Sequence, residues 1–145
     1  MNTKMRVIVF LCAAALFGCQ KPKPPQPNAS LPDLVLVPDP RPGFGFNVTE
    51  QVPGDGLALL VTVKNQGSVD APSSTTTVRF TGGGSAFPVD VPTFALSAGT
   101  SVTLHVPFPQ SCFQPDCGFE IEVDSKKQVD ESDEGNNKGT GFIVG

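Results

Sequence analysis

The chain has 145 residues, with 10 Lys and Arg against 14 Asp and Glu, a formal charge of −4, and neither Trp nor Tyr. This acidic balance provides no basic stripe for phosphates, so it argues against nucleic acid as a partner. The lack of Trp and Tyr removes the aromatic platforms on which sugars stack, which also makes a carbohydrate ligand a poor expectation.

Residues 1–18 have the pattern of a secretory signal peptide. A basic start precedes an apolar run at 7–17, which is shorter than the about 20 residues that a membrane-spanning helix needs. Leu16-Phe17-Gly18-Cys19 resembles the lipobox of bacterial lipoproteins. We therefore predict an exported chain that is anchored to the bacterial membrane, at the cell envelope or surface, by palmitate-type lipid on Cys19. The alternative is an ordinary signal peptide followed by an unmodified cysteine.

Residues 19–31 are expected to form a tether. Four prolines lie between positions 22 and 27, and little in the segment can pack into a core. Such a chain is extended and rises about 3 Å per residue, giving a stand-off of about 30 Å. Residues 32–145 remain, which is enough for a single domain.

The rest of the chain reads as β-strands. Apolar and polar residues alternate at 57–64, 102–106 and 119–124, and no window beyond the signal has a helical period. Turn-forming residues separate these runs, which indicates an all-β antiparallel sandwich. Further strand candidates are Leu34–Val37, Phe44–Thr49, Thr75–Phe80, Phe87–Val91 and Gly141–Val144.

The alternation also predicts which side chains are buried. Val61, Leu104 and Ile121 should face the core, whereas Thr103 and His105 should face solvent. The run Gly82-Gly83-Gly84-Ser85 is expected to be a flexible hairpin loop, because no Lys-Ser or Lys-Thr pair follows it to bind a phosphate.

Five short motifs in one order resemble CARDB, the cell-adhesion-related domain found in bacteria. The resemblance spans nearly all of residues 33–144. It implies a single Ig-like sandwich of about seven strands over 32–145, with an adhesive or scaffolding role. In chain order, the motifs are Asp33-Leu34, Val61-Thr62-Val63-Lys64-Asn65-Gln66-Gly67, Leu96-Ser97-Ala98-Gly99-Thr100-Ser101, Val123-Asp124 and Glu131-Ser132-Asp133-Glu134-Gly135-Asn136-Asn137.

Two of these motifs have local physical reasons. The Asn65 side chain is expected to bond its own backbone at the end of a strand, where Gly67 would take a positive φ. Ala98-Gly99 should form a tight turn.

Cys112 and Cys117 are expected to form a disulfide. An exported chain meets an oxidising compartment, and only one histidine is present to complete a metal site.

An acidic turn near the C-terminus is the candidate metal site. Its hard oxygen ligands suit calcium, although the spacing excludes an EF-hand, since Gly141 stands where the bidentate glutamate would be. The alternative, which we prefer, is that Glu131 and Asn137 cap backbone amides of a hairpin turn while the other acids are solvated. The candidate calcium ligands are Asp124, Asp130, Glu131, Asp133, Glu134, Asn136 and Asn137.

No pattern of residues predicts catalysis, and the chain is not expected to be an enzyme or to need a cofactor. The best expectation is non-catalytic adhesion or protein–protein contact, made by pairing of a partner with an exposed strand edge. Two alternatives remain open: a calcium-stabilised binding module, and a purely structural spacer in an envelope assembly.

Overall fold

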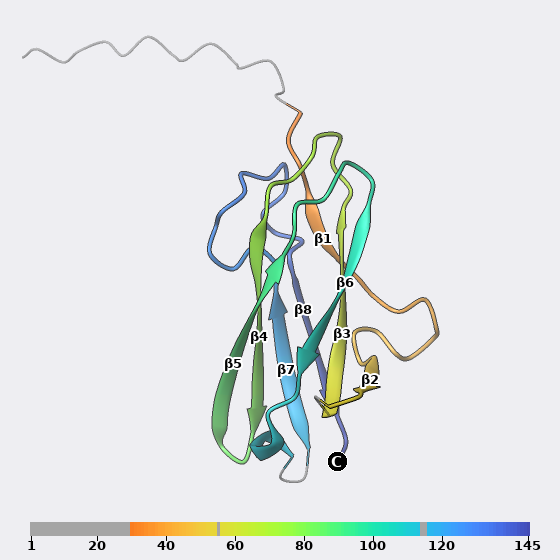
Figure 1. Cartoon of the computed structure of the whole chain (residues 1–145), viewed down its shortest axis with the longest axis vertical. Coiled ribbons are helices and arrows are strands. Elements are labelled where there is room, and N and C mark those ends of the chain that lie inside the picture. The colour runs from red at the N-terminus through yellow and green to blue at the C-terminus, as the bar shows by residue number, and fades with distance from the viewer. Residues whose placement is uncertain (1–29, 55, 114–115) are drawn as a thin grey trace, which may run out of the picture.

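A computed structural model describes residues 30–54, 56–113 and 116–145. The expected signal peptide, Cys19 and nearly all of the tether lie outside these residues. The described chain enters at one end of a two-layered sandwich, and Gly145 lies at the other end (Figure 1). Within these described ranges, no helix has the length and apolar character to span a membrane.

The two layers are antiparallel sheets of four strands each, which confirms the expected all-β sandwich. In the first, the β3 sheet, β3 is central: β6 pairs along one side of it, while β1 and β2 pair with the two ends of its other side. Its strands are β1 (Leu34–Val37), β2 (Thr49–Val52), β3 (Gly56–Asn65) and β6 (Ser101–Pro107).

The second layer, the β4 sheet, has the order β5-β4-β7-β8. A short 3-10 turn, η1 (Gln110–Cys112), lies between β6 and β7 in the chain. The strands of the β4 sheet are β4 (Ser74–Gly82), β5 (Ser85–Thr93), β7 (Cys117–Glu122) and β8 (Lys138–Ile143). The described chain therefore has eight strands, where about seven were expected.

The core lies between the sheets and is filled from both inner faces. Val61, Leu104 and Ile121 are buried and Thr103 is exposed, which confirms the predicted register. Phenylalanine supplies the aromatic packing: the Phe80 and Phe108 rings lie 4.8 Å apart between their centroids. Full burial of one such side chain stabilises the fold by about 1.5–3 kcal/mol.

The strand expected at Phe44–Thr49 is wrong. The strand is β2, which begins only at Thr49, and residues 38–48 form a loop beside β1. Gly43 and Gly45 have φ of 84° and 54° there, and positive φ values interrupt an extended strand. The last strand also differs, since β8 begins at Lys138, three residues before the expected start at Gly141, and ends at Ile143.

The glycine run between β4 and β5 is a tight turn rather than a flexible loop. Gly82 pairs with Ser85, so only two residues connect the strands. Both of these residues, Gly83 and Gly84, have positive φ, of 55° and 79°. A two-residue hairpin turn of this kind matches the twist of its strands and fixes their register.

Gly67 is needed for close packing and not for a positive φ. A Cβ at this position would lie 2.6 Å from the Leu31 carbonyl oxygen, which real side chains do not tolerate. The expected bond at the end of β3 is present, because the Gly67 amide donates to Asn65 Oδ1 at 3.1 Å. The expected tight turn at Ala98-Gly99 is also present, with Gly99 at a φ of 78°.

Candidate functional site

The acidic loop, residues 124–137, connects β7 to β8 and begins with a buried carboxylate. Asp124 is 1% exposed and has a φ of 46°. Its two oxygens accept hydrogen bonds from the amides of Gln128 and Val129, both at 2.9 Å. This carboxylate therefore closes a turn of its own loop, and its acceptor groups point at the backbone.

Glu131 reaches out of the acidic loop to the other sheet. One of its carboxylate oxygens accepts the Leu34 amide of β1, and the other accepts Asn137 Nδ2 at 2.8 Å. The side chain is buried, and burial raises the pKa of Glu131, although the bonds from Leu34 and Asn137 partly oppose this. Glu131 was expected to cap an amide of its own turn, but it bonds the Leu34 amide of β1 instead, because the loop packs against the free side of β1.

Asn137 also differs from the expectation. It caps no backbone amide with its side chain but donates to Glu131 and so orients that carboxylate. Its backbone carbonyl accepts the Val123 amide at 2.9 Å and continues the pairing of β7 with β8.

The remaining acids of the loop make local bonds near the surface. Asp133 accepts the Gly135 amide at 2.8 Å. Glu134 pairs with Lys127 at 2.5 Å, a contact that lowers the pKa of Glu134 and raises the pKa of Lys127. Asp130 is exposed. Each of these carboxylates therefore has its own partner or is exposed to water.

The loop is joined to the start of β1 by amide side chains. Asn136 Nδ2 donates to one oxygen of Asp33 at 2.8 Å, and Gln66 Nε2 donates to the other at 3.0 Å. The side-chain oxygens of Asn136 and Asn137 are buried without a hydrogen-bond partner. Among the described residues, no group of three or more His, Cys, Asp or Glu is arranged to hold a metal ion.

The predicted disulfide is confirmed: Cys112 and Cys117 are bonded, and both are fully buried. The bond holds η1 against the end of the β4–β5 hairpin. A Cβ at Gly82 would lie 1.8 Å from the Cys112 carbonyl oxygen, so only glycine fits beneath this turn. The disulfide is therefore structural and lies at one end of the sandwich.

The outer face of the β3 sheet, called here the apolar face, has an unusual composition for a surface. A sheet with one wet face normally presents polar residues there. Here β3 contributes the buried Ala58 and the half-buried Leu60 to the outward positions, and the neighbouring segments contribute further apolar side chains in register with them. These are Val35, Val37, Val48, Val52 and Pro107. Lys64 and the pair formed by Glu50 and His105 lie on the same face.

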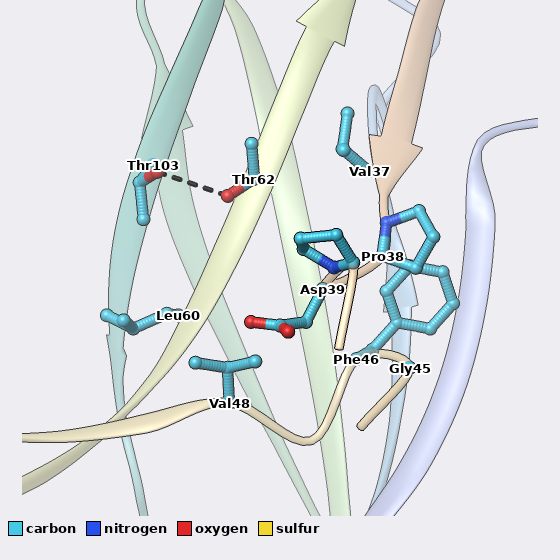
Figure 2. A pocket seen from close by; sticks show the side chains of 10 residues that line it. Val37, Pro38, Asp39, Gly45, Phe46, Val48, Leu60, Thr62 and Thr103 are labelled. Carbon is cyan, nitrogen blue, oxygen red and sulfur yellow. Dashed lines mark hydrogen bonds between the residues drawn. The ribbon is translucent and has the colours of Figure 1, made fainter. Parts of the chain in front are cut away.

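A pocket of about 310 Å³ lies on the apolar face. Its floor includes Leu60 and Thr62 of β3 and Thr103 of β6, and its wall is the 38–48 loop (Figure 2). The Thr62 and Thr103 hydroxyls are hydrogen-bonded at 3.1 Å across the two strands. The pocket thus combines aliphatic walls with a short row of hydroxyl groups and the Asp39 carboxylate (Figure 2).

The 38–48 loop is closed on itself by a bond from the Asp39 amide to the Gly45 carbonyl, at 2.7 Å, and contains an exposed ion pair. The Arg41 guanidinium contacts both oxygens of Asp39, at 2.8 and 2.9 Å, and lies 4.1 Å from the centre of the Phe44 ring. These hydrogen bonds lower the pKa of Asp39, so it stays ionised beside the pocket at neutral pH. The next aromatic ring, Phe46, packs against Gly139 of β8, where a Cβ would lie 2.6 Å from it.

The outer face of the β4 sheet carries more charged side chains than the apolar face does. Its outward positions carry Arg79, Glu120 and Glu122, together with Asp90, which pairs with Lys126 at 3.1 Å. The two outer faces of the sandwich therefore differ, and the apolar one, which also holds the pocket, is the better candidate for contact with a partner.

The apolar face was missed by the sequence analysis, although its signal is visible there. Ala58 and Leu60 interrupt the alternation of the 57–64 strand, since they are apolar residues at positions expected to face water. The pocket could not have been found in this way, because it needs the 38–48 loop, and the second half of this loop, from Phe44, was predicted to be a strand.

The CARDB family model matches residues 31–141. Among solved structures, the chain is similar to the CARDB domain of a Pyrococcus furiosus protein in complex with di-metal ions, at 20% identity and a TM-score of 0.55, covering 81% of this chain and 96% of that one. It is also similar to a domain of a Methanosarcina acetivorans protein described as a cell surface protein, at 20% identity and a TM-score of 0.51, covering 79% and 91%. No curated protein matches the chain. The family match confirms the resemblance seen in the motifs.

The buried bonds of Glu131 can be tested by truncation. Glu131→Ala leaves the Leu34 amide and Asn137 Nδ2 without an acceptor, and each buried unsatisfied donor costs about 1–3 kcal/mol. We expect the free energy of unfolding, measured with urea, to fall by about 2–4 kcal/mol. Asp130→Ala in the same loop is the control and should change it by less than about 0.5 kcal/mol. Equal losses for the two variants would contradict the assigned role of Glu131.

Proposed function

Because the chain belongs to the CARDB family, we propose that it is a non-catalytic binding module that makes adhesive or protein–protein contacts at the bacterial cell surface. The observation that carries this proposal is the apolar face with its pocket of about 310 Å³. Concave sites with mostly apolar walls and a few polar groups are typical of binding sites. The proposal includes pairing of a partner with a strand edge, which requires only backbone groups and suits a chain without Trp or Tyr.

The location that we propose is the outside of a bacterial membrane, with lipid on Cys19 as the anchor. It is supported by the lipobox-like sequence before Cys19 and by the similarity to a domain of a protein described as a cell surface protein. Replacement of the thiol in Cys19→Ser removes the acceptor of the lipid, so the chain should move from the membrane fraction to the soluble fraction. Unchanged partition of the mature chain into detergent would contradict the anchor.

Binding is tested with a pair of matched substitutions. The full chain should bind in a saturable way to envelopes of the cells that produce it, and Leu60→Asp should weaken this at least tenfold by placing a charge on the apolar face. Phe142→Asp is the control, because Phe142 is 59% exposed on the outer face of the β4 sheet. Its binding should equal that of the unchanged chain.

Two outcomes contradict the binding proposal. If no saturable binding is found with correctly folded chain, the domain is a structural spacer. If both variants lose binding equally, the contact is not made by the apolar face.

A calcium-stabilised module is the second candidate. It is supported by the similarity to a CARDB domain in complex with di-metal ions and by the buried, unpartnered side-chain oxygens of Asn136 and Asn137. The separate partners of Asp124, Glu131 and Glu134 favour the first candidate, since calcium takes six to eight oxygen ligands around one point.

Thermal unfolding in calcium and in chelator separates these candidates. An ion present at 100 times its Kd and bound only by the folded chain stabilises it by about 2.7 kcal/mol, which raises the Tm by several degrees. We expect almost no difference in Tm between millimolar calcium and chelator. A large rise in calcium that is lost in Asp130→Ala and Asp133→Ala would instead establish a metal site in the acidic loop.

A further inference from the structure

The free edge of β6 has a continuous row of unpaired backbone groups. The Thr100 carbonyl accepts the Asn65 amide of β3, and the Phe108 amide donates to the Leu57 carbonyl. The N–H and C=O groups of successive residues point to opposite sides of a strand. Those of residues 102, 104 and 106 therefore point to β3, and those of residues 101, 103 and 105 point to the free edge. Ser101, Thr103 and His105 are exposed, and within the described residues no strand pairs with this side of β6.

The edge of β5 is blocked by proline. The two-residue turn makes Gly82 and Ser85 a hydrogen-bonded pair, so the even-numbered residues of β5 face the free edge. Two of these are Pro88 and Pro92, which have no amide hydrogen to donate. A partner strand would find donors only at Ala86 and Asp90.

The other edges are short or already in use. On β8, the Phe142 amide donates to Asn47 Oδ1 at 3.0 Å. On β1, the Leu34 amide is held by Glu131, and the Pro32 carbonyl accepts the Ser132 amide at 3.0 Å. The edge of β2 presents only two residues, because this strand has four in all. In the described structure, β6 therefore has the longest uninterrupted free edge.

We propose that the partner at this edge is a second copy of the chain, with its β6 antiparallel to the first and Thr103 opposite Thr103 of that copy. This inference rests on the proposed function and names the edge and its partner. Three pairs of residues then exchange both of their backbone hydrogen bonds: Thr103 with Thr103, and Ser101 with His105 in both directions.

The side chains match in this register on both faces. On the outer face, Thr103 meets Thr103 and extends the hydroxyl row that begins with the Thr62 to Thr103 bond. On the inner face, Val102 stands opposite Leu104, so apolar residues meet apolar residues. Cross-strand Thr–Thr and aliphatic pairs of this kind stabilise antiparallel sheets.

The nearest registers, centred on Val102 or Leu104, keep only two complete pairs, because they place His105 opposite Gly99 or Ser101 opposite Pro107. Registers one step further away are poorer still. Centring the pair on His105 places Thr103 opposite Pro107, which has no amide hydrogen. Centring it on Ser101 places Thr103 opposite Gly99, whose amide already donates to the Asn65 carbonyl. The register about Thr103 is thus the one in which all three outward-facing residues form complete pairs.

The antiparallel pairing also sets where the two chains enter. The described chain begins at the end of the sandwich where β6 starts, and Gly145 lies at the opposite end (Figure 1). In the pair, the two entering segments therefore lie at opposite ends. This geometry suits contact between two facing surfaces better than contact between neighbours on one surface.

Disulfide trapping in the full chain tests the register. Directly opposed residues of a hydrogen-bonded antiparallel pair have Cα atoms about 5.5 Å apart, within the range of a disulfide. Under mild oxidation, Thr103→Cys should give a linked dimer of twice the mass of the chain. Ser101→Cys should give no more linked dimer than the unchanged chain does, because the residues at position 101 of the two copies would lie more than about 13 Å apart. Mixed Ser101→Cys and His105→Cys chains should link to each other.

Sedimentation provides a second measurement on reduced protein. Thr103→Pro removes a donor that faces the free edge and leaves the bonds to β3, so it should abolish the concentration-dependent rise in sedimentation coefficient. Thr140→Pro is the matched control, since the Thr140 amide also faces away from its neighbouring strand. It should leave the association unchanged.

The outcomes separate this inference from the proposed function. A monomeric Thr103→Cys chain, or equal linking of Thr103→Cys and Ser101→Cys, overturns the β6 pair. Linking of Thr103→Cys to a protein of another mass overturns the second copy as partner. In each of these cases, the proposed function would still stand if the full chain bound envelopes in a saturable way and Leu60→Asp weakened this binding. If the full chain showed no saturable binding, the proposed function would be contradicted as well.

Discussion

A buried carboxylate ties the two sheets of this domain together at one edge. Glu131 belongs to the loop that joins two strands of the β4 sheet, yet it holds the Leu34 amide at the start of the β3 sheet. Because β1 is only four residues long, its own pairing with β3 is limited, and this bond fixes its free side. The 38–48 loop continues directly from β1, so the wall of the pocket on the apolar face depends on where Glu131 places that strand.

A second buried side chain, at the end of β3, also joins segments that are far apart in the sequence. Asn65 is completely buried and accepts the amides of Asp33 and Gly67, while its Nδ2 donates to the carbonyls of Val69 and Leu96. All four of its bonds are to backbone, and they join three separate stretches of chain. Buried amides and carboxylates that are fully bonded in this way specify one arrangement of loops, since any other arrangement would leave polar groups without partners.

The sequence was sufficient for most of the fold because the strands are long and their apolar residues alternate. β3, β6 and β7 were found from period two, and the Cys112–Cys117 disulfide from the oxidising compartment that an exported chain meets. It was insufficient where distance along the chain was large: Glu131 and Leu34 are 97 residues apart, and nothing local to either predicts their bond. It also failed at 44–49, where Gly45 and the preceding Gly43, both with positive φ, turn an apolar run into a loop.

The prolines of β5 limit how far this protein could assemble. A sandwich with two open edges can add copies at both, and growth of that kind continues into fibres. Pro88 and Pro92 remove the donors from one edge, so a contact made through β6 uses the long free edge of each copy and leaves no equivalent edge for a third. Such a molecule has a valency of one, and its assemblies close as pairs instead of growing.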